Sequence, residues 1–167
     1  MKPERSNIAA LAMLASLWSG TSALAQPADL NLKFSCSASN GEGETRVILA
    51  DSGEIRIRDG KLLEFRWESA LHRRTHGFDC SMDQSDKLEL QPLEHGWRVA
   101  PQDAAAARAA RGFDTDRGQT CLVNLLRDGD TVHIQPSCPV LCGSRSDFSE
   151  FRVHLPSSRC DYVSTTE

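Results

Sequence analysis

The sequence predicts an all-β fold: a small antiparallel β-barrel or sandwich of about eight or nine strands, with one short helix and three disulfides. Three observations predict it. Short runs of alternating polar and apolar residues recur between glycine-containing turns, which is typical of antiparallel sheets. All six cysteines follow an N-terminal leader, and only one segment has the composition of a helix.

Residues 1–25 have the features of a secretory signal peptide. Lys2 and Arg5 form a basic start, an apolar run follows, and Ala23-Leu24-Ala25 offers the small residues that a signal peptidase requires. The apolar run is too short to span a bilayer. We therefore expect a soluble protein that does not span the membrane, cleaved near Ala25 and periplasmic or secreted.

The first half of the mature chain predicts four strands. They are expected at residues 31–36, 45–49, 54–58 and 61–67. The run Glu54-Ile55-Arg56-Ile57-Arg58 alternates as a strand with one solvent-facing side should. Asp59-Gly60 follows it directly and is a strong signal for a two-residue hairpin turn.

The second half continues this pattern and adds the helix. Strands are expected at residues 77–82, 87–91, 96–100, 119–126, 131–135 and 150–155, with a second hairpin turn at Asp128-Gly129-Asp130. Residues 104–111 form either a short helix, which Asp103 would cap and Gly112 would end, or a flexible loop. We expect one domain over residues 26–162 and a flexible tail at 163–167.

The even number of cysteines in an exported domain predicts a disulfide framework. The alternative is a metal site, because Cys138 and Cys142 have the spacing of metal ligands. No second cysteine pair or neighbouring histidine pair supplies the remaining ligands. The sequence therefore predicts no metal and no cofactor.

Local geometry favours one pattern among the many possible disulfide pairings. If Asp128-Gly129-Asp130 turns the chain, Cys121 comes to lie almost opposite Cys138, and we expect these two to pair. Cys142 and Cys160 would then bracket the last strand, which leaves Cys36 to pair with Cys80. The other pairings stay open, because sequence spacing does not determine connectivity.

The charge balance limits the class of partner. The chain has 19 basic and 23 acidic residues, a formal net charge of −4. General nucleic-acid binding requires a basic surface over the phosphates, so the composition argues against it. An acidic protein attracts a cationic protein partner, such as a basic cell-wall hydrolase.

Known catalytic arrangements are not recognisable in the sequence. It has no Gly-x-Ser-x-Gly turn, and six bridged cysteines would leave no thiol nucleophile. His133 and His154 fall inside alternating strands, where an outward or half-buried position is expected. A hydrolase with an unrecognised pair of carboxylates remains an alternative, because sequence does not show the separation of two carboxylates.

Two segments are candidates for partner binding. The first contains His72, Arg73 and Arg74, in a loop that also includes His76 and forms the densest basic cluster of the chain. Arginine side chains bind carboxylates and phosphates through paired hydrogen bonds, so this loop suits an acidic partner surface. The alternative is a solvated loop without function. A zinc site is not expected here, because the arginines repel cations and a third ligand is missing.

The second segment is the run from Cys138 to Phe148. Two cysteines, Pro139 and Gly143 favour a tight loop that would present Ser144, Arg145 and Ser146. A rigid loop loses little conformational entropy on docking, as in small inhibitors. The alternative is a structural turn between two strands.

The pattern Cys138-x-x-x-Cys142-Gly143-x-Arg145-x-x-Phe148, with Cys121, Leu122 and Gly129 before it, resembles a group of small exported bacterial proteins. Some of these carry lysozyme-inhibitor labels, and the resemblance covers the last third of the chain. It implies a disulfide-bearing β-barrel or sandwich that inserts a polar loop into the cleft of an enzyme. The Ser-Gly-x-x-Tyr motif of membrane-bound lysozyme inhibitors is missing, so the resemblance assigns no inhibitory residue.

These observations predict an exported binding protein that is not an enzyme. The most concrete form is an inhibitor or immunity-type protein against a cell-wall hydrolase such as lysozyme. The alternative is a non-catalytic accessory protein of the cell envelope that binds peptidoglycan, a secretion machine or an outer-membrane partner.

Overall fold

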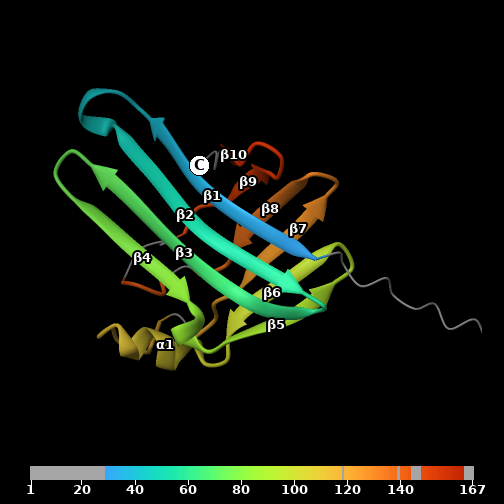
Figure 1. Ribbon diagram of the computed structural model, residues 1–167. Coiled ribbons are helices and arrows are strands. Elements are labelled where there is room, and N and C mark those ends of the chain that lie inside the picture. The colour runs from blue at the N-terminus through green and yellow to red at the C-terminus, as the bar shows by residue number, and fades with distance from the viewer. Residues whose placement is uncertain (1–28, 118, 139, 144–147, 164–167) are drawn as a thin grey trace, which may run out of the picture.

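The chain folds into two antiparallel sheets that face each other, as a computed structural model shows (Figure 1). The structure describes residues 29–117, 119–138, 140–143 and 148–163. A four-stranded sheet, called sheet A below, has the order β1-β2-β3-β4, and a six-stranded sheet, sheet B, has the order β10-β9-β8-β7-β6-β5. Neighbouring strands within each sheet are therefore consecutive in the chain. The predicted all-β class is confirmed in the form of a sandwich-like fold.

The strands of sheet A are β1 (Leu30–Asn40), β2 (Val47–Arg58), β3 (Lys61–Arg73) and β4 (Gly77–Asp83). Those of sheet B are β5 (Leu88–Leu93), β6 (Gly96–Pro101), β7 (Val123–Asp128), β8 (Thr131–Pro136), β9 (Phe151–His154) and β10 (Arg159–Tyr162). Two short 3₁₀ helices, η1 (Gly43–Thr45) and η2 (Gln84–Asp86), and the helix α1 (Ala104–Ala110) complete the described elements.

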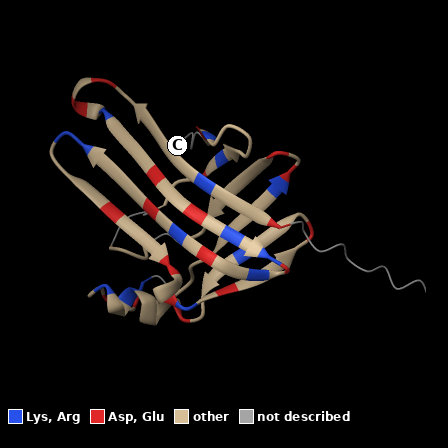
Figure 2. Cartoon of the chain, viewed as in Figure 1, with Lys and Arg blue, Asp and Glu red and all other residues tan. Residues whose placement is uncertain are grey.

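Strict alternation of side chains gives sheet A a buried face and a solvent face. Along β1, Leu30, Leu32 and Phe34 are buried and the residues between them are exposed. Charges of opposite sign lie side by side on the solvent face, where Lys33, Glu54, Arg66 and Asp83 are aligned across the four strands (Figure 2). Such cross-strand pairs favour this register over a one-residue slip, which would bury the charges.

The core lies between the two sheets and is rich in aromatic side chains. Trp67, Trp97, Phe65 and Phe151 are among its largest fully buried members. The ring of Phe151 from sheet B lies 5.3 Å from that of Phe34 and 5.7 Å from that of Trp67, both from sheet A. These contacts join the sheets and bury apolar surface, which is the main source of stability in such a fold.

The predicted turn at Asp59-Gly60 is confirmed. It joins β2 to β3, and both residues have positive φ, 50° for Asp59 and 69° for Gly60. A turn of this kind matches the twist of antiparallel strands, and glycine adopts it without steric cost. The second turn, between β7 and β8, also falls where the sequence predicts it.

Two features of the strands differ from the prediction. The segments expected as separate strands at 45–49 and 54–58 are one continuous strand, β2, because Asp51 and Ser52 pair across to both β1 and β3 instead of turning. Strand β10 was not predicted. It has only four residues, and the apolar Cys160 and Tyr162 alternate with two charged residues at the end of the domain.

The three disulfides are Cys36–Cys160, Cys80–Cys142 and Cys121–Cys138. The prediction for Cys121–Cys138 is confirmed. Val123 pairs with Pro136, and the same register extended by two residues places Cys121 opposite Cys138, with a Cα–Cα distance of 4.2 Å. This bridge therefore closes the open end of the β7–β8 hairpin.

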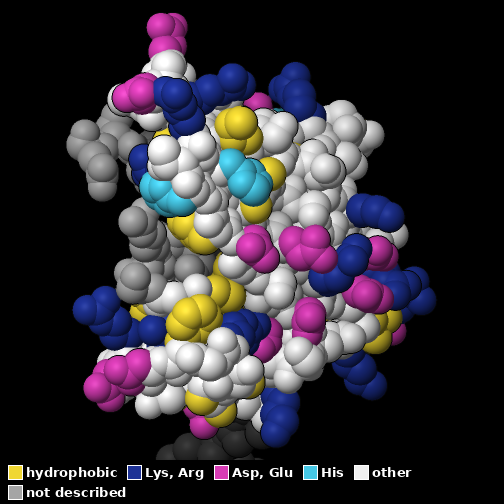
Figure 3. Space-filling view, turned by 90° about the vertical axis from the view of Figure 1, so that its left-hand side faces the viewer, with side chains coloured by type: hydrophobic (Ala, Val, Ile, Leu, Met, Phe, Trp, Pro, Cys, Tyr) yellow, Lys and Arg dark blue, Asp and Glu magenta, His cyan; other side chains and the backbone are white. Residues whose placement is uncertain are grey.

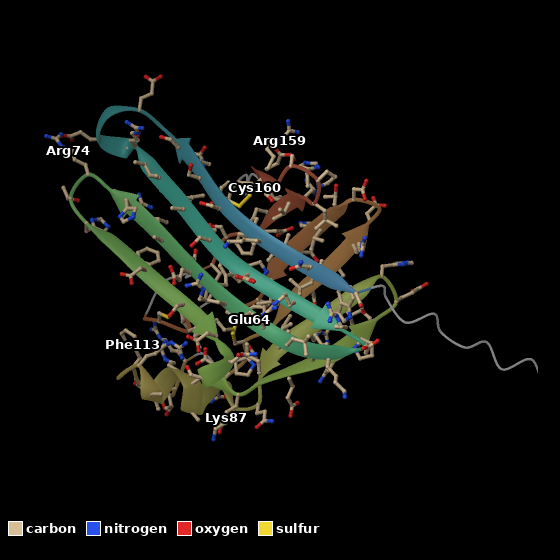
Figure 4. The ribbon with its side chains drawn as sticks, in the orientation of Figure 1. Glu64, Arg74, Lys87, Phe113, Arg159 and Cys160 are labelled. Carbon is tan, nitrogen blue, oxygen red and sulfur yellow. A yellow bond between two sulfur atoms is a disulfide. The ribbon has the colours of Figure 1, made fainter. Side chains whose placement is uncertain are left out.

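The predicted pairs Cys36–Cys80 and Cys142–Cys160 are wrong. Cys36 lies on β1 and Cys80 on β4, which are the opposite edges of sheet A. Three strand spacings separate them, roughly 14 Å, whereas a disulfide joins Cα atoms less than about 7 Å apart. Each of the two edges is instead bridged out of sheet A, β1 to Cys160 on β10 and β4 to Cys142 after β8. Figure 4 shows the bridge at Cys160 behind β1.

The helix at α1 is confirmed with its expected cap. The side chain of Asp103 accepts a hydrogen bond from the backbone of Ala106 at 2.9 Å, and Gly112 follows the helix with a φ of 80°. Ala104 and Ala107 bury its inner side. The alternative of a flexible loop is therefore replaced by a fixed element that connects β6 to β7.

The predicted signal peptide and most of the predicted tail lie outside the described residues. Val163 donates a backbone hydrogen bond to Glu150 at 3.0 Å. Within the part of the chain that the structure describes, we find no helix that is long and apolar enough to cross a membrane. Three disulfides in a domain of this size are typical of proteins that fold in an oxidising compartment.

Candidate partner-binding site

The segment that follows β8 is fixed at several points before residue 144. Cys138 is bridged to Cys121, which lies just before β7. Cys142 is bridged to Cys80 of β4. Between Cys138 and Cys142, Leu141 is only 1% exposed and belongs to the core. We call residues 138–143 the loop base. Two disulfides and a buried leucine hold it against both sheets.

Arg108 of α1 forms a further anchor for the loop base. Its guanidinium group donates hydrogen bonds to the carbonyl oxygens of Val140 and Gly143, the second at 2.6 Å, and its Nε donates to Asp114. The side chain also lies over the ring of Phe113, 5.4 Å from the ring centre. Arg108 is 3% exposed, so breaking these bonds would leave a buried charge without partners.

The chain is fixed again at Phe148. This residue is 8% exposed, and its ring lies 4.6 Å from that of Trp67 in the core. The four residues 144–147 therefore connect two anchored positions, Gly143 and Phe148. The predicted partner-binding residues Ser144, Arg145 and Ser146 belong to this connection and lie outside the described residues.

The other predicted patch occupies the tip of the β3–β4 hairpin. His72 and Arg73 are the last residues of β3, and Arg74 starts the turn; all three are exposed. The backbone N–H of Arg73 donates to His76 across the turn at 2.8 Å. Arg74 points away from the sheet (Figure 4) and forms an ion pair of 2.5 Å with Glu44 in η1. One of the two arginines thus already has a carboxylate partner.

The loop base and the arginine hairpin belong to the same end of the molecule. Cys142 in the loop base is bridged to Cys80, and Cys80 is three residues from Gly77, where the β3–β4 turn ends. Three residues of a strand span roughly 10 Å. Viewed from this end, basic and acidic side chains lie at the top of the surface, with histidine and hydrophobic side chains below them (Figure 3). The disulfide framework therefore brings the loop base close to the arginine hairpin.

The inner face of sheet A is apolar but incompletely covered at this end. Val47, Leu49, Leu71 and Phe78 occupy inward positions, as the register of β2, β3 and β4 shows. They are half-buried and lie outside the core cluster. Apolar side chains rimmed by arginines are a composition that suits contact with another protein.

A buried polar group lies below this surface, at the level of the two inter-sheet disulfides. Asp51 is 2% exposed and pairs with Cys36 on one side and Ser69 on the other. Its two carboxylate oxygens accept hydrogen bonds from Trp67 and Tyr162, each at 2.8 Å. Burial raises the pKa of Asp51 above its ordinary value, although the hydrogen bonds from Ser69, Tyr162 and Trp67 act in the opposite direction.

The pKa of Tyr162 is also raised, first by burial and then by the nearby charge of Asp51. The hydroxyl therefore stays protonated and acts as the donor. Because Tyr162 lies on β10 and Asp51 on β2, the bond fastens the last strand to sheet A beside the Cys36–Cys160 bridge.

The sequence alone did not reveal Arg108 or Asp51. Arg108 was one of several arginines in an alanine-rich run. Its i, i+4 relation to Ala104, the first residue of the helix, was the only signal for an inward position. Asp51 stood at a presumed turn, where an aspartate is ordinary. A continuous alternation through residues 47–58 would have placed it on the buried face.

The described residues offer no recognisable metal centre, because no group of three or more potential ligands converges. Comparison with known proteins gives no further direction: the chain matches no protein-family model, no curated protein and no solved structure. The assignment of a function therefore depends on the site itself.

Proposed function

We propose that this protein is an exported, non-catalytic binding protein that inhibits, or confers immunity against, a cell-wall hydrolase such as lysozyme. In this proposal residues 144–147 are the contact loop, and the arginine hairpin of His72, Arg73 and Arg74 is a second contact. The observation that carries it is the anchoring of the loop base. A short polar segment lies between Gly143, held by Arg108, and Phe148, packed on Trp67.

Such anchoring favours binding because a loop with fixed ends loses less conformational entropy when it docks. Two disulfides and a buried arginine restrain the six residues of the loop base. A turn that only joined β8 to β9 would not require that degree of restraint.

The chemistry of the two contacts suits the cleft of a glycoside hydrolase. Enzymes of this class use carboxylates to cleave the glycosidic bond. A guanidinium group binds a carboxylate through paired, charge-assisted hydrogen bonds. Arg145 and Arg73 supply such groups, while the net charge of −4 attracts a basic enzyme from a distance.

The test is the stoichiometry of a complex between the oxidised protein, without residues 1–25, and a basic lysozyme. We expect a one-to-one complex in calorimetry and a parallel loss of wall-lytic activity. The double variant Ser144→Ala/Arg145→Ala should lose both. The matched control is Ser52→Ala/Arg66→Ala, which removes the same groups from the solvent face of sheet A.

Two outcomes would contradict the proposal. Unchanged inhibition by the loop variant would remove the contact loop from the mechanism. Sedimentation with purified peptidoglycan, without any effect on lysozyme, would point to an accessory protein of the envelope instead.

A further inference from the structure

The outer face of sheet B has an open pocket of about 660 Å³ that the proposed function does not use. It lies around the β7–β8 turn, at the opposite end of these strands from the loop base. Its lining is rich in histidine and arginine: His95, Leu126, Arg127, Asp128, Thr131, His133, Arg152 and His154. Three of the five histidines of the chain thus line one pocket, and its volume is in the range of small-molecule sites.

His154 is held in one orientation by two partners. Its Nε2 lies 2.7 Å from a carboxylate oxygen of Asp161, and its Nδ1 lies 3.3 Å from the hydroxyl oxygen of Thr131. An ionised carboxylate only accepts hydrogen bonds, so Nε2 carries a proton. In the neutral ring Nδ1 is then an acceptor, and the hydroxyl of Thr131 donates to it. The pKa of Asp161 is lowered, mainly by this contact with His154.

Protonation of His154 reverses the second hydrogen bond. Both ring nitrogens become donors, so Nδ1–H donates to the oxygen of Thr131. The hydroxyl proton of Thr131 must then turn away from the ring, and it can donate to a ligand in the pocket. The same event adds a positive charge to the lining.

The remaining charges decide which ligand such a change would favour. Carboxylates outnumber guanidinium groups around the pocket while the imidazoles are neutral. The titratable and charged groups in the neighbourhood of His154 are Arg127, Asp128 and Asp130 on and after β7, His133 on β8, Glu150 and Arg152 at β9, Arg159 and Asp161 on β10, and Glu94 and His95 between β5 and β6.

Two of these groups make the protonated pocket more attractive to an anion. His133 lies 2.6 Å from Glu150, so its protonated form has a carboxylate beside it. Arg152 is exposed, and its guanidinium group forms no hydrogen bond with a described residue; it lies opposite Asp161, whose charge it shares with His154. Protonated imidazoles would balance the surrounding carboxylates and allow Arg152 to attract an anion.

We propose that this pocket binds a small oxyanion, a carboxylate or phosphate group, when His154 and its neighbouring histidines are protonated. Arg152 supplies the charge, the released hydroxyl of Thr131 donates a hydrogen bond, and His154 acts as the positioning residue that controls this hydroxyl. The site goes beyond the proposed inhibitor function and does not depend on it.

Sulfate is a suitable probe because it stays a dianion across the range in which imidazoles titrate. We would follow backbone amide shifts during a sulfate titration at about pH 5.5 and at about pH 8, at constant ionic strength. The expected result is binding in the pocket at the lower pH, weakened roughly tenfold or more at the higher pH. Equal affinity at both pH values, or no shifts in the pocket, would overturn the proposal.

Matched variants test the role of the hydroxyl. Thr131→Val keeps the shape of the side chain and should lose most of the affinity gained at low pH, whereas Thr131→Ser should retain it. His72→Gln removes a histidine from the other end and should change nothing. A Thr131→Val variant that binds sulfate like the unmodified protein would overturn the assigned role. At low pH, galacturonate and glucose 6-phosphate then distinguish a carboxylate from a phosphate ligand.

Discussion

The two ends of the β7–β8 hairpin are built in opposite ways. At the open end, the Cys121–Cys138 bridge, the Cys80–Cys142 bridge and Arg108 fix the loop base from three directions. At the turn end, the histidine pocket has no disulfide, and its polar contacts join exposed or half-exposed side chains. The first arrangement restrains the backbone, while the second leaves side chains free to change charge. The difference supports the proposed protein contact at one end and the proposed proton-sensitive site at the other.

The largest effect should come from removing the bridge that restrains the loop base. We expect Cys80→Ser/Cys142→Ser to lower the free energy of unfolding by roughly 2–4 kcal/mol, since the bridge limits the unfolded chain. Because it also removes one of the restraints on the loop base, the variant should bind lysozyme more weakly. Urea denaturation and calorimetry measure the two quantities.

The matched control removes the other bridge between the sheets. Cys36→Ser/Cys160→Ser should cost comparable stability, but it leaves the loop base anchored and should keep the binding. If both double variants bind equally well under conditions in which they are folded, restraint of the loop base does not matter for the contact.

The second effect concerns Arg108. Replacement by Met keeps the length of the side chain but leaves the carbonyl groups of Val140 and Gly143 without their donor, so we expect a loss of about 2–3 kcal/mol in urea denaturation. Arg66→Met, on the solvent face, should change stability by less than about 0.5 kcal/mol. Similar values for both variants would show that the loop base does not need this anchor.

The third prediction concerns the buried carboxylate of Asp51. Because its pKa is raised on folding, its contribution to stability is present below the ordinary value of 3.8 and is lost as pH rises through the folded-state pKa. Asp51→Asn retains an acceptor for Trp67 and a partner for Tyr162, and it does not ionise. The stability of the variant relative to the unmodified protein should therefore increase as pH rises from about 3 to about 7.

Urea denaturation of both proteins over this pH range measures that difference. Asp79→Asn, an exposed position on β4, is the control and should give a flat difference curve. A stability difference for Asp51→Asn that falls with rising pH would mean that the hydrogen bonds outweigh burial at this site.

The smallest change in stability is expected at the arginine hairpin. Arg73→Ala/Arg74→Ala removes exposed side chains, and the ion pair with Glu44 is a surface contact of little energy, so stability should stay within about 0.5 kcal/mol. Because the hairpin arginines are proposed to contact carboxylates of lysozyme directly, the complex should dissociate roughly tenfold faster, while association with the basic enzyme should not slow. Stopped-flow dissociation rates measure this, with Arg58→Ala/Arg66→Ala as the control, which changes the net charge equally; equal acceleration by both variants would contradict a specific contact.

The sequence predicted those features that depend on neighbours along the chain. The turn at Asp59-Gly60, the helix cap at Asp103 and the bridge across the β7–β8 hairpin are all local, so their residue types and spacing determine them. The pairing of Cys36 and Cys80 with distant partners depends on how two sheets are stacked. Alternation along a strand carries no information about that stacking, and the prediction for these two bridges was wrong for this reason.

The candidate site shows the same division. The position of the loop base followed from its cysteines, proline and glycine. Its anchor, Arg108, lies more than thirty residues before the carbonyl groups that it binds. The histidine pocket likewise combines residues from three strands, β7, β8 and β9, with His95 from the turn between β5 and β6. The lining of the pocket depends on the order of strands in sheet B, and the Arg108 anchor depends on where α1 packs. Neither can be inferred from spacing along the chain.

The most direct test of the account is hydrogen exchange of the protein, oxidised and without residues 1–25, in the presence and absence of a basic lysozyme. We predict that added lysozyme protects the amides of residues 140–148 and 72–77, while those of the β7–β8 turn exchange at unchanged rates. Protection at the β7–β8 turn alone, or no change at either end, would contradict the assignment of the anchored loop as the partner-binding element.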